Sequence, residues 1–169
     1  PGKNSDAVAE LALGHIIACD RRIVDASLDL RNGNWKKKAY QNAAGLKGRT
    51  MGIIGLGSIG GALAKLAKGL DMNVIAWSRS LTPDKADELG LVYCKSIVEV
   101  AANADVVSVH LAVTPDTKHL LNNDFFNKMK DGAIFVNTSR GEIVDTAALR
   151  KAIDEKALRI GLDVFENEP

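Results

Sequence analysis

The sequence predicts an α/β fold in which helices cover both faces of a parallel sheet, and three observations lead to this prediction. Short apolar runs alternate with helical patterns from residue 50 to the end of the 169-residue chain. A helix separates successive runs, which favours parallel pairing over hairpins. One run leads directly into Gly55-Leu56-Gly57-Ser58-Ile59-Gly60, a G-x-G-x-x-G spacing in the strand–turn–helix setting of a dinucleotide site. We therefore expect a doubly wound, Rossmann-type sheet with right-handed crossovers.

A helical pattern precedes this alternating region. From Ser5 to about Gly33, apolar residues recur at spacings of three and four, as on one face of a helix. Asn4 or Ser5 is the expected N-cap, and the cluster Asn32-Gly33-Asn34 is expected to end the helix. The residues of the apolar stripe are Val8, Leu11, Ala12, His15, Ile16, Cys19 and Ile23.

A polar connector from Trp35 to Lys47 follows, and its Lys36-Lys37-Lys38 run indicates a solvated face rather than a phosphate site. We therefore divide the chain into a helix with its connector at residues 1–48 and a dinucleotide-binding domain at residues 49–169.

Strands and helices then follow in regular order. Thr82-Pro83-Asp84 combines an N-cap, a proline that the first turn accepts and an acidic first-turn residue, and Asp145 caps a later helix. The expected helices are Ser58–Leu70, one beginning at Thr82, Ser96–Asn103, and one from Asp145 to Glu155. The expected strands are Thr50–Ile54, Asn73–Trp77, a short one around Val92-Tyr93, Asp105–His110, Ala133–Asn137 and Arg159–Val164.

Each glycine of the turn has a physical role in binding a dinucleotide. Gly55 permits the tight turn, Gly57 lets the backbone approach a pyrophosphate, and Gly60 lets the helix pack closely on the strand. Ser58 and Ile59 begin the helix, where unpaired N–H groups and the helix dipole attract phosphate. The dinucleotide should lie across the carboxyl ends of the strands.

The sequence leaves NAD and NADP both open, with NADP favoured. An acidic residue about 20 positions after the glycine turn usually binds the adenosine ribose of NAD. Here the second strand ends in Ser78-Arg79-Ser80, with no carboxylate at its tip. Arg79 can form charge-assisted hydrogen bonds to a 2′-phosphate, with Ser78 and Ser80 as small donors. The alternative is that Arg79 stacks on adenine or points to water, which is compatible with NAD.

The composition argues against several other classes of protein. With 22 basic and 21 acidic residues the chain carries a net charge of +1, which gives no reason to expect nucleic acid as a partner. Its apolar runs are too short for a membrane span. Cys19 and Cys94 match neither a metal-site spacing nor a disulfide framework, so we expect no metal and two half-buried free thiols in the cytoplasm.

Three more motifs follow the glycine turn in order. They are Val109-His110-Leu111-Ala112-Val113-Thr114-Pro115-Asp116-Thr117, Asn137-Thr138-Ser139-Arg140-Gly141-Glu142-Ile143-Val144-Asp145 and Gly161-Leu162-Asp163-Val164-Phe165-Glu166-Asn167-Glu168-Pro169. The chain resembles the D-isomer-specific 2-hydroxyacid dehydrogenases, the family of phosphoglycerate dehydrogenase and glyoxylate/hydroxypyruvate reductase. This resemblance implies hydride transfer between the nicotinamide of NAD(P) and C2 of a small 2-keto or D-2-hydroxy acid.

The resemblance assigns the catalytic residues. It makes Arg140 the substrate arginine, whose planar cation would hold the carboxylate and polarise the ketone. It makes Glu168 the carboxylate that pairs with a catalytic histidine and raises the pKa of that histidine. Asp163 would lie beside the nicotinamide and accept from its carboxamide, whereas Glu166 is expected to be a solvated neighbour.

The resemblance also assigns cofactor neighbours. His110, Leu111 and Ala112, with Thr117 beyond them, would line the adenosine–ribose side, although Ala112 stands where the family often has proline. Thr138 and Ser139 would approach the nicotinamide ribose.

No histidine occupies the family's acid/base position, which would follow Glu168. We expect His15 to be a packed core residue, His110 to lie beside the cofactor and His119 to be solvated. The chain is thus expected to be the coenzyme domain of a longer enzyme, without its substrate domain, that binds nucleotide but does not turn over alone. Residues 1–48 resemble the family's interdomain helix, which also contributes to a homodimer.

Two other functions are alternatives to the dehydrogenase. A nucleotide-sensing scaffold or corepressor could use the same fold, but it would need neither Arg140 nor Glu168. A homocysteine-forming hydrolase is opposed by the Ser-Arg-Gly sequence at residues 139–141 and by the Asp163-to-Glu168 motif.

Overall fold

The computed structural model describes residues 4–166, which form a six-stranded sheet with every strand parallel. The strand order is β3-β2-β1-β4-β5-β6, so the chain changes direction across the sheet between β1 and β4. This is the strand order of a Rossmann domain. The strands are β1 (Thr50–Ile54), β2 (Asn73–Trp77), β3 (Val92–Tyr93), β4 (Val106–Val109), β5 (Ile134–Asn137) and β6 (Arg159–Leu162).

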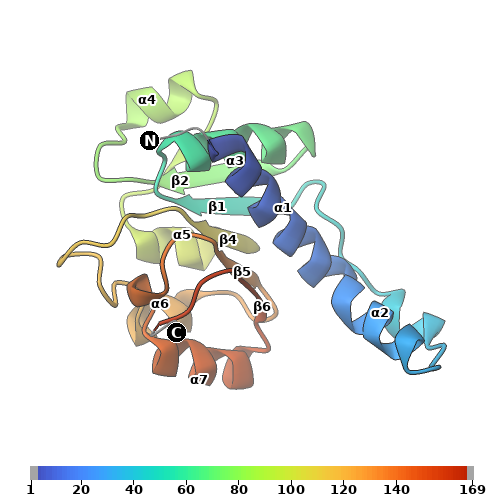
Figure 1. Ribbon diagram of the computed structural model, residues 1–169. Coiled ribbons are helices and arrows are strands. Elements are labelled where there is room, and N and C mark those ends of the chain that lie inside the picture. The colour runs from blue at the N-terminus through green and yellow to red at the C-terminus, as the bar shows by residue number, and fades with distance from the viewer. Residues whose placement is uncertain (1–3, 167–169) are drawn as a thin grey trace.

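Helices cover both faces of the sheet (Figure 1), as the sequence predicted. Apolar side chains of alternating strand residues form one core with α1 and α3 and another with α5, α6 and α7. The helices are α1 (Ser5–Arg21), α2 (Ile23–Arg31), α3 (Ser58–Gly69), α4 (Pro83–Glu88), α5 (Ile97–Asn103), α6 (Asn123–Lys128) and α7 (Thr146–Lys156). Two short 3-10 helices, η1 (Lys37–Tyr40) and η2 (Gly141–Ile143), complete the described elements.

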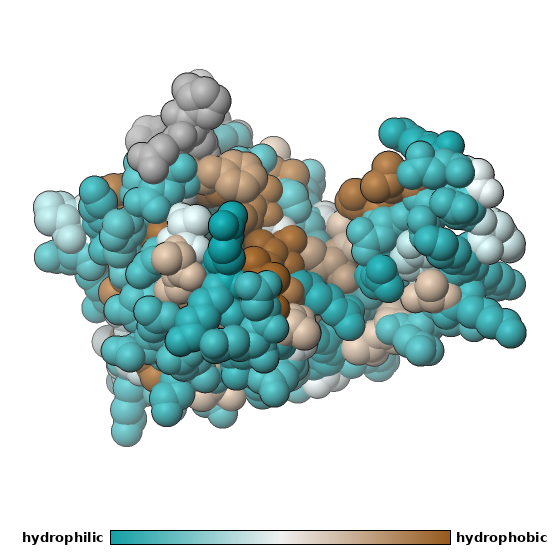
Figure 2. Space-filling view, turned by 90° about the horizontal axis from the view of Figure 1, so that it is seen from below, coloured by the Kyte–Doolittle hydropathy of each residue, from teal (hydrophilic) through white to brown (hydrophobic). Residues whose placement is uncertain are grey.

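The expected single helix from Ser5 to about Gly33 is wrong. Arg22 has a left-handed φ of 52° and separates α1 from α2. α1 buries Ala9, Ala12 and Ile16 against the sheet, whereas α2 buries no residue and projects away from the body (Figure 1). We call α2 and η1 together the arm. Figure 2 shows a hollow between the arm and the rest of the molecule.

A buried ion pair fixes the end of α1 to the start of β1. The Asp20 carboxylate is 2 % exposed and accepts from Arg49 Nη1 at 3.0 Å and from the Gly45 N–H at 3.0 Å. The expected helix starts at Thr82, Ser96 and Asp145 are confirmed, because each side chain accepts a first-turn N–H.

The sequence pattern missed α6. Asn122 caps this helix by accepting from the N–H groups of Asp124 and Phe125. Phe125 and Phe126 are buried and contact the ring of Phe135 of β5 edge-to-face. The exposed polar side of α6 therefore covers a packed aromatic cluster.

Candidate functional site

The glycine turn between β1 and α3 has the geometry that a bound pyrophosphate requires. Gly55 has a φ of +96°, and a Cβ there would lie 2.4 Å from the carbonyl oxygen of His110. A Cβ on Gly60 would lie 2.1 Å from the carbonyl oxygen of Gly55. Gly57 is exposed, and nothing lies within 4 Å of its Cβ position. Two glycines therefore shape the turn, and the third leaves its backbone open to a ligand.

The start of α3 can receive an anion. Its N-cap is Gly57, which has no side chain to cap the helix. The first N–H groups, which include those of Ser58 and Ile59, therefore point to the same open side of the turn.

His110 follows β4 as a largely buried, neutral imidazole. Its Nε2 lies 3.0 Å from Ser108 Oγ, and its buried Nδ1 finds no hydrogen-bond partner among residues 4–166. Burial lowers the pKa of His110 to about 4, so the ring carries no charge at pH 7.

Thr138 ends the neighbouring strand in the same way. Because β4 and β5 pair Val109 with Asn137, His110 and Thr138 follow their strands side by side. The hydroxyl of Thr138 is buried and, within the described part of the chain, also unpartnered. Buried polar atoms are rarely left without a hydrogen bond, so this pair marks a place where a polar ligand fits.

Asn137 holds the loop that carries Arg140. Its side chain is 1 % exposed; Nδ2 donates to the Arg140 carbonyl at 2.9 Å, and Oδ1 accepts from both the N–H and the hydroxyl of Ser139. The guanidinium of Arg140 is exposed and donates to the Ser139 carbonyl at 2.7 Å. The sequence interpretation gave Asn137 no role, although a polar residue that ends a buried strand was an available signal.

The segment after β6 returns to this loop. The Asp163 N–H donates to the Asn137 carbonyl at 3.1 Å. A Cβ on Gly141 would lie 2.0 Å from the carbonyl carbon of Phe165, so glycine allows the two backbones to touch. The structure thereby brings Asp163 and Arg140 to one end of the sheet, as the resemblance implied. Glu168 lies outside the described residues.

The expectation that Glu166 is only a solvated neighbour is wrong. Glu166 is not merely solvated: its Oε1 lies 2.6 Å from His119 Nε2, and its Oε2 accepts from the Thr146 hydroxyl at 3.0 Å. The hydrogen bond from His119 and that from Thr146 lower the pKa of Glu166. His119 is exposed, as expected, and its ring is also paired with Glu166, because the chain folds the loop after β4 against the segment after β6.

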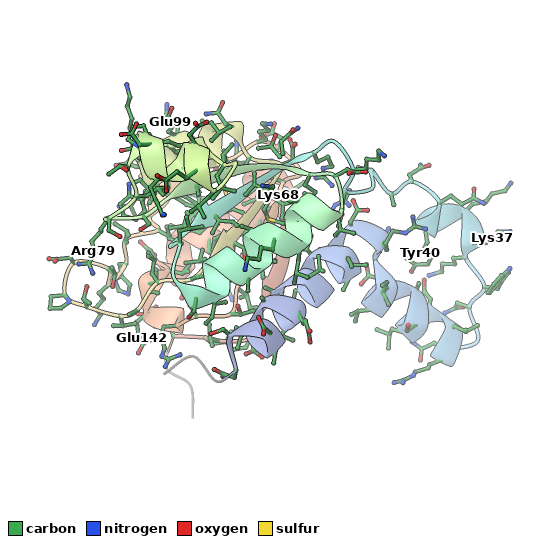
Figure 3. The ribbon with its side chains drawn as sticks, turned by 90° about the horizontal axis from the view of Figure 1, so that it is seen from above. Lys37, Tyr40, Lys68, Arg79, Glu99 and Glu142 are labelled. Atoms are coloured by element: carbon green, nitrogen blue, oxygen red, sulfur yellow. The ribbon has the colours of Figure 1, made fainter. Side chains whose placement is uncertain are left out.

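The residues that follow β2 lie at the same carboxyl ends of the strands, on the other side of the glycine turn from Arg140 and Asp163. Ser78, Arg79 and Ser80 form a turn with no carboxylate among them, and Arg79 is exposed. Figure 3 shows Arg79 and Glu142 at the same end of the molecule, far from Lys37 and Tyr40 of the arm.

The loop after β4 is stiffened from within. Thr117 is buried; its hydroxyl donates to the Ala112 carbonyl at 2.7 Å and accepts from the Thr114 N–H at 2.7 Å. These bonds restrain the loop at Ala112, where the family often has proline. Contact between Thr117 and a nucleotide stays a prediction, because the structure shows its hydroxyl engaged inside the loop.

The remaining candidates lie away from this edge. His15 is partly exposed against Gly161 of β6, which corrects the expectation of a core histidine. Among residues 4–166, no group of three His, Cys, Asp or Glu side chains could hold a metal, and no helix is long and apolar enough to cross a membrane.

Comparisons with known proteins agree with this geometry. The family model of the D-isomer specific 2-hydroxyacid dehydrogenase NAD-binding domain matches residues 13–169. The chain belongs to this family. Its sequence is 43% identical to the glyoxylate reductase of Thermococcus litoralis, and the match covers 100% of this chain and 53% of that protein. It is 37% identical to a D-3-phosphoglycerate dehydrogenase of Methanocaldococcus jannaschii, covering 100% of this chain and 32% of that protein.

A solved structure of D-lactate dehydrogenase from Salmonella has a TM-score of 0.89 at 35% identity, covering 99% of this chain and 50% of that one. The chain of this dehydrogenase domain therefore spans about half the length, or less, of these relatives. The relatives are dehydrogenases and reductases of small acids, and they do not favour the scaffold or corepressor alternative. The family assigns NAD(P) as the ligand of the site, and the open glycine turn and the unpartnered Thr138 hydroxyl fit it.

Proposed function

We propose that this domain serves an enzyme that transfers a hydride between NAD(P) and C2 of a small 2-keto or D-2-hydroxy acid. The bound nicotinamide supplies the hydride acceptor or donor. The single observation that carries the proposal is the meeting of two segments at one strand edge. Asn137 holds the Arg140 loop on one side and accepts the Asp163 N–H on the other.

In this proposal, Arg140 binds the substrate. Its guanidinium is exposed beside the nicotinamide end of the site, so it can form two parallel hydrogen bonds to a carboxylate or stabilise charge on the C2 oxygen. Asn137 fixes the backbone of Arg140, which limits the loop movement that would misplace this charge.

Asp163 and Glu168 are proposed to act on the nicotinamide and on a histidine. The exposed Asp163 carboxylate can accept from the carboxamide and set the orientation of the ring. Glu168 would pair with an acid/base histidine. Because the chain spans about half the length of its relatives, we expect it alone to bind dinucleotide without measurable reduction of glyoxylate or hydroxypyruvate.

The cofactor is proposed to be NADP in preference to NAD. Arg79 lies in the turn after β2 with no acidic neighbour in Ser78-Arg79-Ser80 to repel a 2′-phosphate. Hydrogen bonds to a charged group contribute about 1.5–3 kcal/mol, which corresponds to roughly 10- to 150-fold in affinity.

A side-by-side titration tests both the binding and the preference. The chain is titrated with NADH and NADPH, together with the variants Arg79→Ala and Arg150→Ala; Arg150 is an exposed arginine on α7. Arg79→Ala should lower the affinity for NADPH at least tenfold and leave the affinity for NADH nearly unchanged. Arg150→Ala should change neither affinity. Equal losses for both nucleotides would refute the role of Arg79, and absence of binding to either would refute the proposed function.

A homodimer is proposed as the assembled form, with the arm contributing. The arm exposes its apolar residues widely, which is unusual for an isolated surface: Ile23 47%, Val24 69%, Leu28 58%, Leu30 58%, and next to η1 Trp35 76%. A dimer should appear by sedimentation and dissociate in Leu28→Asp. The free thiols of Cys19 and Cys94 support a cytoplasmic location.

A further inference from the structure

The contact between Glu166, His119 and Thr146 joins three parts of the chain that are distant in sequence. Glu166 lies after β6, His119 in the loop after β4, and Thr146 at the first position of α7. Both carboxylate oxygens are engaged, and the Glu166 side chain is 24% exposed. A main-chain bond also ties the His119 loop to η2, since the His119 N–H donates to the Glu142 carbonyl at 2.8 Å.

Side-chain burial contributes little to holding the segment from Asp163 to Glu166, although its backbone touches that of Gly141. A cavity of about 110 Å³, lined by residues that include Asn137, Val144 and Leu149, lies beneath it. Phe165, its largest apolar residue, is 60% exposed, so burial of this side chain contributes little. Polar contacts therefore carry much of the restraint: the Asp163 N–H on Asn137 and the carboxylate of Glu166.

From this arrangement we propose that Glu166 is a positioning residue, which together with His119 and Thr146 holds the segment that places Asp163 at the nicotinamide. The inference rests on the proposed function, because Asp163 matters only if a nicotinamide lies beside it. Breaking these contacts of Glu166 loosens the nicotinamide end and leaves the adenine end, at Arg79 and the glycine turn, intact.

Two measurements on the isolated chain test the role of Glu166. The first is hydrogen exchange of the Asp163 amide, followed by NMR in the absence of nucleotide. Glu166→Ala should accelerate this exchange at least tenfold, and Thr146→Val should accelerate it less, because one of the two contacts remains. Asp154→Ala, an exposed acidic residue on α7, is the matched control and should have no effect.

The second measurement compares NADPH with 2′-phospho-ADP-ribose, which lacks the nicotinamide. Glu166→Ala should lower the affinity for NADPH about fivefold to tenfold and leave the affinity for 2′-phospho-ADP-ribose unchanged. Glu166→Gln should recover part of the lost affinity. Gly141→Ala provides an independent variant, because its Cβ would push away Phe165 without touching the carboxylate. It should reproduce both effects.

The possible failures can be told apart. If the Asp163 amide exchanges at the wild-type rate in Glu166→Ala, the inference is overturned. It is also overturned if Glu166→Ala lowers the affinity for both ligands equally, which would indicate a general loss of structure. Failure of the wild-type chain to bind NADPH, 2′-phospho-ADP-ribose and NADH refutes the proposed function, and the exchange measurement still decides whether Glu166 anchors the segment.

Discussion

Alanine at Gly60 should lower the stability of the fold, whereas alanine at Gly57 should lower the affinity for nucleotide, although the two positions are three residues apart. At Gly60 the new Cβ would lie 2.1 Å from the Gly55 carbonyl oxygen, where real Cβ contacts are never shorter than 3.0 Å. The turn and α3 must therefore separate by about 1 Å. Overpacking of this kind costs about 1–3 kcal/mol. For a domain of this size, each kcal/mol lowers Tm by about 2–4 °C, so we expect Gly60→Ala to lose about 2–12 °C.

Gly57→Ala should leave the fold almost unchanged. Its Cβ meets nothing within 4 Å, and its φ of −82° is open to alanine. A change in Tm below about 2 °C is expected. The methyl group would instead occupy the side of the turn that a pyrophosphate approaches, so affinity for NADPH and for 2′-phospho-ADP-ribose should fall by about tenfold or more.

Calorimetry and nucleotide titration of both variants provide the assay. The matched pair separates a glycine required by packing from one required by a ligand. Wild-type affinity in Gly57→Ala would show that no phosphate approaches this turn. An undiminished Tm in Gly60→Ala would show that the close approach between Gly60 and Gly55 does not constrain the fold.

Three further perturbations have defined outcomes. Asp20→Ala removes a buried partner of Arg49 and should lower the free energy of unfolding, measured by chemical denaturation, by about 3 kcal/mol. Lys47→Ala breaks an exposed ion pair and should lower it by less than about 1 kcal/mol. Thr138→Val removes a buried hydroxyl that only a ligand satisfies. The free energy of unfolding of the free chain should therefore stay unchanged or rise by up to about 1 kcal/mol, while the affinity for NADPH falls. A loss of stability together with the loss of affinity would contradict this. The buried His110 has its pKa lowered to about 4, so the unfolded chain binds more protons between about pH 6.5 and 4 and stability falls as the pH decreases through that window. His110→Asn should remove up to about 1.4 kcal/mol per pH unit of this slope, and identical slopes would refute it.

The sequence predicted the sheet well because local signals and tertiary packing agree there. β1, β2 and β3 have the expected bounds, since each is an apolar run ended by turn residues. The helix caps at Thr82, Ser96 and Asp145 followed from short-range hydrogen bonding, which a sequence displays directly. Arg140 and Asp163 were named by motif, and both follow parallel strands that end at one edge of the sheet, whereas their roles stay predictions.

The errors arose where long-range contacts decide the structure. The apolar spacing continues through Arg22, so periodicity could not reveal the left-handed residue that separates the arm from α1. Only the folded chain brings His119 to Glu166, across 47 positions, and no local pattern marks either residue. Asn137 was overlooked because its role depends on three hydrogen bonds to a loop whose conformation the sequence does not display.

Asn137 has a consequence for the cooperativity of the domain. Loops commonly open at a lower free energy than the core, and they form local unfolding units of their own. Here the buried side chain of the last residue of β5 is bonded to the backbone of Ser139 and Arg140, so the loop cannot open without breaking bonds inside the core. During denaturation, protection of these amides should therefore disappear together with that of β5. The arm buries no residue of α2 and is free to melt earlier as a separate unit.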